Sequence, residues 1–155
     1  MEQLNHQKYK IAERMIYAGA RSPTIAQALG LSIARARKMH KFISNRSSTS
    51  GQSPWDAKFF LGPMVMQSSA FANLFDKVCK TNPDDMEAER VLSAYISYIL
   101  IYGSNAQIPF DRAWNLTIHM RTKKLKLVPC RCCSMKVIVS QLYPRDITIC
   151  PICDQ

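Results

Sequence analysis

The sequence predicts a mainly α-helical protein with a basic helix-turn-helix-like unit at its N-terminus and a small four-cysteine module at its C-terminus. Three observations predict this arrangement. Apolar residues recur at helical spacing over most of the 155 residues, two Cys-x-x-Cys pairs stand near the end, and a net charge of +10 gathers at both ends. We divide the chain into a helix-turn-helix-like unit 1–46, a linker and anchor segment 47–63, a helical core and partner-binding region 64–127, and a cysteine module 128–155.

Three short helices are predicted in the N-terminal unit, over residues 7–18, 24–29 and 33–44. Ser22 is expected to cap the second helix, with Pro23 in its first turn. Gly30 can take a positive φ in the turn that follows, and Ser32 is expected to cap the third helix. A tight turn between two such helices is typical of a helix-turn-helix.

The third predicted helix has two different faces. At about 100° per residue, the face expected to pack against the unit holds Ile33, Ala36, Met39, His40 and Ile43. The opposite face holds Arg35, Arg37, Lys38 and Lys41. A recognition helix needs this arrangement, because one side anchors to its own domain while the other meets phosphates and base edges. Similar three-helix units also serve purely to bind proteins, so DNA contact and protein contact both stay open.

A polar, serine-rich linker at 44–54 precedes the apolar middle region. Helices are predicted over residues 64–79 and from a capping box at Asp84 and Glu87 to residue 102. The second of these helices is apolar nearly all round. We therefore expect it to be buried on several sides, either inside the chain or partly against another subunit.

A last helix is predicted to begin at 109–111. Its helical repeat extends to Leu125, so its final turns are expected to carry Arg121, Lys123, Lys124 and Lys126. Cations at that end suit the helix macrodipole, and they could equally contact phosphates.

Two Cys-x-x-Cys pairs stand near the end of the chain with sixteen residues between them: Cys130, Cys133, Cys150 and Cys153. Two residues within each pair let one tight turn aim both thiolates at a single ion, and two pairs complete a tetrahedral shell. Because a closed shell leaves no position for substrate or water, the pattern predicts one structural Zn²⁺ per chain in a zinc-ribbon-like module.

Other uses of these cysteines remain open. An iron or iron–sulfur site, two disulfides and a thiol redox pair are the alternatives. Cys132 could replace Cys133 as a ligand only if the spacer shrank to one residue. Cys79 is expected to be a buried small apolar residue.

Positive charge is concentrated in the two ends of the chain. Residues 1–46 hold nine Lys or Arg against two acids, a net +7, and residues 121–155 hold seven against two, a net +5. Residues 47–120 have a net charge of −2. We expect a polyanion such as DNA to contact both ends, through the third helix and through Lys123, Lys124, Lys126, Arg131 and Lys136. Ordinary solvated basic faces are the alternative.

The sequence lacks the features that mark several classes of protein. The longest apolar run, 91–102, is shorter than the roughly 20 residues that cross a bilayer, and residues 1–10 do not resemble a secretory signal. The three histidines lie far apart, and no glycine-rich phosphate loop is present. We therefore expect a cytoplasmic protein that is not an enzyme, has no small-molecule substrate and does not enter the membrane.

Three motifs also point to a known family. They are Cys130-x-Cys132-Cys133 followed by Cys150-x-x-Cys153, the preceding Ala113-Trp114-x-Leu116, and Gly19-Ala20-Arg21 before the helix-turn-helix-like stretch. In these the chain resembles the FlhC family of flagellar transcriptional activators. The resemblance implies a bacterial cytoplasmic regulator that works in a hetero-oligomer with FlhD, binds promoter DNA of flagellar operons and aids RNA polymerase. It also implies that the two Cys-x-x-Cys pairs hold the zinc and that Cys132 is left free.

The chain departs from the family pattern at two places. The family has a glycine directly after the third cysteine of the first cluster, where this chain has Ser134, so we expect the turn to be made differently. The family also continues past its last cysteine with a basic tail, whereas this sequence ends at Gln155, so any DNA affinity of that tail would be missing. An accessory paralogue, a zinc-dependent adaptor without its own DNA readout, and a thiol redox protein are therefore the alternatives to a DNA-binding activator subunit.

Overall fold

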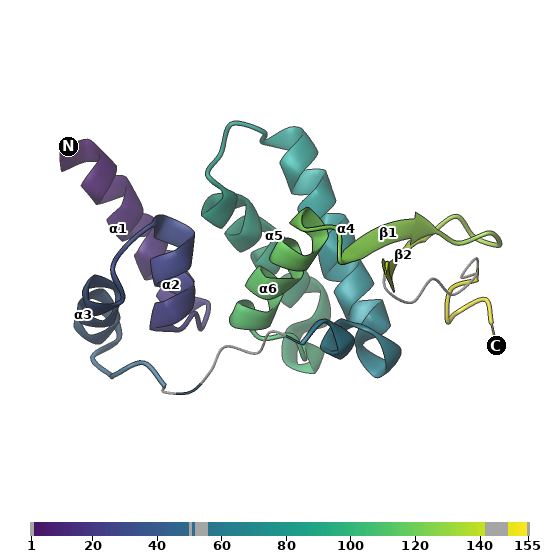
Figure 1. Cartoon of the computed structure of the whole chain (residues 1–155), viewed down its shortest axis with the longest axis horizontal. Helices are drawn as coiled ribbons and strands as arrows, with labels where there is room; N and C mark the ends of the chain where they lie inside the picture. The colour runs from purple at the N-terminus through teal and green to yellow at the C-terminus, as the bar shows by residue number, and fades with distance from the viewer. Residues whose placement is uncertain (1, 50, 52–55, 142–148, 155) are drawn as a thin grey trace.

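The computed structural model describes residues 2–49, 51, 56–141 and 149–154 (Figure 1). Within these residues the chain is mainly helical, as predicted, with one small antiparallel hairpin. The α-helices are α1 Glu2–Tyr17, α2 Ser22–Leu29, α3 Ile33–Ser44, α4 Val65–Thr81, α5 Glu87–Tyr102 and α6 Phe110–Arg121. Three 3-10 helices are η1 Ala57–Phe60, η2 Gly62–Met64 and η3 Gly103–Asn105, and the strands are β1 Leu125–Pro129 and β2 Lys136–Ser140.

The main hydrophobic core runs from α1 to β2. Its members include Met15, Ile25, Phe71, Leu92, Leu116 and Ile138, each at most 2 % exposed. In Figure 1, α1 to α3 lie at one end of the long axis, α4 to α6 in the middle, and the hairpin at the other end. The two positively charged ends of the sequence therefore lie at opposite ends of the molecule.

Polar contacts join the N-terminal helices to α6. Arg21 donates from its backbone N–H to Asp111 Oδ1 at 3.1 Å and from its Nε to Asp111 Oδ2 at 2.8 Å. Gln27 of α2 accepts a hydrogen bond from Trp114 Nε1 at 3.1 Å. Because Asp111 and Trp114 are buried and the Arg21 side chain is mostly covered, these contacts fix how the N-terminal unit sits on the middle helices.

Buried tyrosines of α5 hold the segment that leads into α6. The Tyr95 hydroxyl donates to the Ile108 carbonyl at 3.0 Å, and the Tyr98 hydroxyl accepts from the backbone N–H groups of Gln107 and Ile108. Burial raises the pKa of Tyr95 to about 12. The start of α6, which carries Asp111, is thus attached to the core.

The structure corrects the predicted end of the last helix. α6 ends at Arg121, not near Lys126. Lys123 takes φ 60°, and the backbone N–H of Lys124 donates to the His119 carbonyl at 2.9 Å, which closes the helix. Leu125 and Lys126 then belong to β1, where they pair with Ser140 and Val139 of β2.

Two predicted helix caps are also wrong. Ser22 is the first residue of α2 rather than its cap, and no side chain caps that helix. The α5 helix begins at Glu87, so the predicted pair of Asp84 and Glu87 lies too early; the Glu89 carboxylate accepts from the Met86 N–H instead. The cap at Ser32 is confirmed, since its Oγ accepts from the Arg35 N–H at 3.2 Å. Gly30 has the predicted positive φ, 62°.

The α5 helix is buried on only part of its circumference. Tyr98 and Leu92 are fully buried, but Ile96, Ile99, Leu100 and Ile101 are exposed. Burial inside the chain alone therefore does not cover this helix, and coverage of its exposed part by another subunit stays a prediction. No described helix is long and apolar enough to span a bilayer.

Candidate metal centre and cationic surfaces

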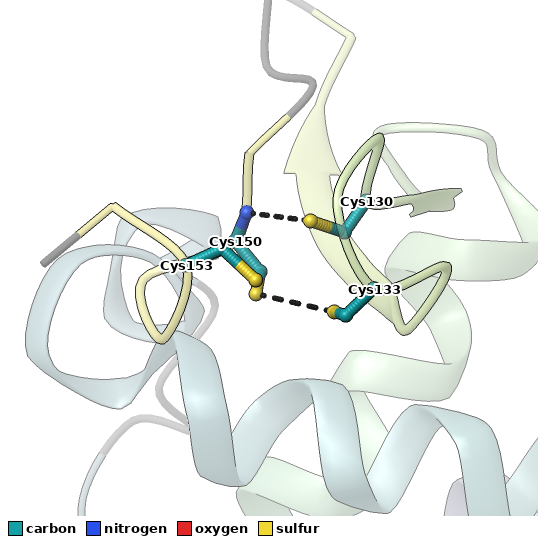
Figure 2. A group of neighbouring side chains, drawn as sticks. All are labelled: Cys130, Cys133, Cys150 and Cys153. Atoms are coloured by element: carbon teal, nitrogen blue, oxygen red, sulfur yellow. Dashed lines mark hydrogen bonds between the residues drawn. The ribbon is translucent and has the colours of Figure 1, made fainter.

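The first pair of cysteines lies in the connection between β1 and β2. Cys130 follows the last residue of β1, and its N–H donates to the Met135 carbonyl at 2.8 Å. The Ser134 N–H donates back to the Cys130 carbonyl at 2.9 Å. The hairpin therefore closes into a tight turn that brings Cys130 and Cys133 to the same side (Figure 2).

Ser134 makes this turn with φ 61°, a left-handed conformation that glycine adopts with least strain. We expected the serine to produce a different turn from the family's glycine. The serine takes a conformation that glycine also adopts, and a difference from the family's own turn stays a prediction.

The second pair approaches from the C-terminal segment. The Cys153 N–H donates to the Cys150 carbonyl at 3.0 Å, which forms a second short turn. The Cys150 N–H donates to Cys130 Sγ at 3.2 Å, and the sulfurs of Cys133 and Cys150 lie 3.7 Å apart (Figure 2). All four sulfurs lie within 4.8 Å of one another, although Cys130 and Cys150 are twenty positions apart in the sequence.

These distances suit a metal ion better than a disulfide. A disulfide needs its sulfurs about 2.0 Å apart, whereas a tetrahedral ion with sulfur ligands at about 2.3 Å places neighbouring sulfurs about 3.8 Å apart. The separation of 3.7 Å between Cys133 and Cys150 matches the second value. The four cysteines could therefore hold a metal ion.

Electrostatics at the cluster also favour a cation. Backbone N–H groups of Cys133 and Cys150 lower the pKa of Cys130 to about 6, which favours its thiolate. Hydrogen bonds with the side chains of Cys150 and Cys133 raise the pKa of Cys153 well above its usual value. Four sulfurs this close cannot all ionise unless a positive charge lies between them. A divalent ion supplies that charge.

The other two cysteines lie outside the cluster. Cys132 is exposed and is not among the four clustered sulfurs. Cys79 lies on α4 and is half-buried, not fully buried as expected, and burial raises the pKa of its thiol.

The cationic face predicted for α3 is exposed to solvent. Ala36 is buried, and Met39 and Ile43 pack against the core. The opposite face is exposed along the helix and contains Arg35, Arg37, Lys38 and Lys41. Ile33, which we expected to pack, is 40 % exposed. His40 is a boundary residue as expected, with its Nδ1 3.2 Å from the Arg46 carbonyl oxygen.

The predicted cations of the C-terminal end are also exposed. They lie in the α6–β1 turn, on β1, in the cysteine turn and on β2: Lys123, Lys124, Lys126, Arg131 and Lys136. None of them takes part in an ion pair within the described residues. Two groups of free cations therefore stand at opposite ends of the molecule, and their contact with DNA stays a prediction.

Two exposed apolar side chains were not singled out from the sequence, although the sequence left open that the helix of the second one packs against another subunit. Phe42 is 80 % exposed on the cationic side of α3, and Leu100 is 80 % exposed in an apolar patch on α5. An apolar residue in a helix usually indicates the core, so periodicity alone does not single out these positions. The absence of any charged residue between Arg90 and Asp111 was a usable signal for the second feature.

Comparison with known proteins gives a consistent result. The family model described as "Flagellar transcriptional activator (FlhC)" matches residues 3–155. Similar proteins include the flagellar transcriptional regulator FlhC of Gallionella capsiferriformans, which is 28 % identical over 95 % of this chain and 83 % of the relative. Those of Nitrosomonas eutropha and Verminephrobacter eiseniae are 26 % and 29 % identical, over 93 % and 90 % of this chain and 77 % of each relative. With its four clustered cysteines and its helical fold, this chain belongs to the FlhC family of flagellar transcriptional regulators.

Proposed function

We propose that this chain is the DNA-binding subunit of a bacterial activator complex that acts in the cytoplasm with an FlhD-like partner to switch on flagellar operons. The observation that carries the proposal is the pair of exposed cationic groups at the two ends of the molecule (Figure 1). No Asp or Glu lies between Glu13 and Asp56, so α3 itself carries no negatively charged side chain. Such a surface favours a polyanion.

The two ends would contribute differently to DNA binding. Arg35 and Arg37 stand on a helix that can enter a groove, and an arginine fork matches the two acceptors on guanine. Lys124, Lys126 and Lys136 stand on or beside the hairpin, and single ammonium groups suit phosphate contacts. We therefore assign sequence readout to residues 1–46 and backbone contact to the end that holds residues 121–155.

The cysteine cluster would hold one structural Zn²⁺ through Cys130, Cys133, Cys150 and Cys153. Beside the cysteines the small core there contains Val137 as a fully buried residue, with Met135 packed against it. So little apolar burial cannot stabilise the module by itself, whereas four thiolates on one zinc ion can. When bound, the ion supplies charge neutralisation and cross-links the two turns. It would keep Arg131 and Lys136 in place beside the DNA.

The exposed apolar patch on α5 would bind the FlhD-like partner. Ile96, Ile99, Leu100 and Ile101 form this patch, and no charged residue lies between Arg90 and Asp111. Exposed apolar surface of this kind marks protein interaction sites. Promoter DNA would then meet the complex at other faces, because α3 and the hairpin, which carry the exposed cations, lie at the two ends of the molecule and α5 lies in the middle (Figure 1). RNA polymerase is a further partner that a transcriptional activator implies.

A salt titration of DNA binding tests the proposal. The zinc-loaded complex is titrated with a flagellar promoter duplex and with a random duplex at several salt concentrations. Lys124→Ala should weaken both complexes equally and reduce the slope of log K against log salt by about 0.9. Arg35→Ala should instead reduce the difference in binding free energy between the promoter duplex and the random duplex, by roughly 1–3 kcal/mol per good base contact. Lys77→Ala, on the exposed side of α4 in the acidic middle region, is the control. It removes the same charge and should change neither the salt slope nor the difference in binding free energy between the two duplexes.

The same titration separates the alternatives. No binding to either duplex would favour a zinc-dependent adaptor that does not touch DNA. If Arg35→Ala lowers affinity uniformly, α3 does not read sequence and the proposed division between the two ends is wrong. For the partner, Leu100→Asp should reduce the hetero-oligomer seen by native mass spectrometry, whereas Tyr17→Asp, at another exposed position, should not.

A further inference from the structure

Phe42 is an unusual exposed side chain. It lies in the last turns of α3 and is 80 % exposed. The other phenylalanines of the chain are buried or half-buried against the core, among them Phe60, Phe71 and Phe110. An aromatic ring in water loses the free energy that its burial would give, so its position on the surface needs a reason.

The ring stands among cations. At 100° per residue, Phe42 lies about 20° from Arg35 and about 40° from Lys38 around the helix axis. All three are exposed, while Ala36 on the other side is buried. Whatever approaches the cationic face of α3 therefore meets the ring of Phe42 as well.

A partner for this face must combine dense negative charge with an apolar group. Duplex DNA combines both, because phosphates line the grooves and the C5-methyl group of thymine projects into the major groove. Phenylalanine is among the side chains that contact this methyl group. Resting on the proposed DNA binding, we infer that Phe42 contacts thymine methyl groups in the major groove and gives α3 a preference for thymine at the bases it covers.

Synthetic duplexes test this inference without knowledge of the operator. The probes are poly(dA-dT) and poly(dA-dU), which differ only by the thymine methyl group. The wild-type complex should bind poly(dA-dT) about fourfold more tightly, which is the value of one buried methyl group. In Phe42→Ala this ratio should fall to about one, while the salt slope stays unchanged because no phosphate contact is lost. Phe42→Leu should keep part of the ratio.

A second pair of probes adds a methyl group to cytosine instead of removing one from thymine. Poly(dG-dC) and its 5-methylcytosine form differ by a methyl group at the corresponding place in the major groove. The wild type should prefer the methylated duplex, and Phe42→Ala should not. Lys38→Ala is the matched control on the same face: it should keep both ratios and reduce the salt slope by about 0.9. Tyr17→Ala, at a 74 % exposed aromatic on α1, should change nothing.

The outcomes distinguish this inference from the proposed function. Salt-dependent binding with equal affinity for all four duplexes overturns the thymine contact and leaves DNA binding intact. A wild-type preference that survives in Phe42→Ala also overturns it, because the methyl group is then read by another residue. If none of the duplexes binds, the proposed function itself fails, and an acidic protein surface becomes the partner for α3.

Discussion

The two ends of this molecule share a positive charge but are stabilised by different physics. The N-terminal helices hold Ile11, Met15, Ile25 and Leu29, each at most 2 % exposed, and these side chains join the main core. The C-terminal module has a separate small cluster in which Cys130, Val137 and Cys150 are buried. One end can therefore fold by burying apolar surface, whereas at the other end Leu125 and Ile138 of the hairpin join the main core and the two cysteine turns depend on their sulfurs. Removal of the metal should therefore destabilise the C-terminal module and leave the N-terminal helices folded.

The largest effect is expected from the cysteines. Cys150→Ala should abolish metal binding and unfold the segment from residue 128 onward, because metal binding to such a site contributes on the order of 10 kcal/mol. Metal content by mass spectrometry and amide NMR signals of the hairpin measure both effects. Cys132→Ala is the matched control and should keep the metal, since Cys132 is exposed and outside the cluster. Full zinc occupancy in Cys150→Ala would refute the assignment.

A core substitution should have a smaller effect at the opposite end. Met15 is fully buried, so Met15→Ala should destabilise the protein by about 2–5 kcal/mol. Urea unfolding followed by helical circular dichroism measures this loss. The loss should be equal with and without a chelator if the N-terminal helices fold independently of the metal. A loss that appears only in the metal-loaded protein would show that the two ends are not stabilised separately.

The contact between the N-terminal unit and α6 comes next. Asp111→Asn removes the charge that Arg21 meets at 2.8 Å, with Asp111 only 6 % exposed. Hydrogen bonds to charged groups contribute about 1.5–3 kcal/mol, so we expect a loss of about 2 kcal/mol in urea unfolding. Asp76→Asn, in the exposed pair with Lys80, is the control and should cost less than about 1 kcal/mol. Equal losses would mean that burial does not strengthen the Arg21 pair.

The smallest effect is expected at two backbone positions, one at each end. Ser134 and Asn45 both have a positive φ, 61° and 55°. Ser134→Gly should stabilise the metal-loaded hairpin by about 0.5–1 kcal/mol, since a left-handed conformation strains serine. Asn45→Gly should gain less, because asparagine tolerates this conformation. Zinc competition measures the first and thermal unfolding the second; a weaker metal affinity in Ser134→Gly would contradict the strain argument.

How far the sequence predicts the structure depends on whether the signal is local. The cysteine pairs are recognisable because two residues between ligands are a local requirement, and the cap at Ser32 and the turn at Gly30 are local as well. The hairpin was missed because Leu125 and Lys126 continue the helical repeat of α6. Their change to strand depends on pairing with Ser140 and Val139, far along the chain.

The identity of the exposed apolar residues was the other feature that the sequence did not predict. Phe42 and Leu100 are apolar residues within predicted helices, as core residues are. Only the packing of α3 and α5 shows that they face solvent. A surface that a partner covers is made of the same apolar residue types as the core that the chain itself covers. The cationic residues were easier to place, because a charged side chain is rarely buried without a partner.

The continuous core from α1 to β2 has a consequence for the DNA that this chain would select. If the N-terminal unit and the hairpin both contact one duplex, the packing between them fixes the distance along the DNA between the two contacts. B-DNA turns once in about 10.5 base pairs. Moving one half of a binding site by half a turn would place it on the opposite side of the duplex from the end of the protein that contacts it. The fold would thus measure distance along a promoter as well as read its bases.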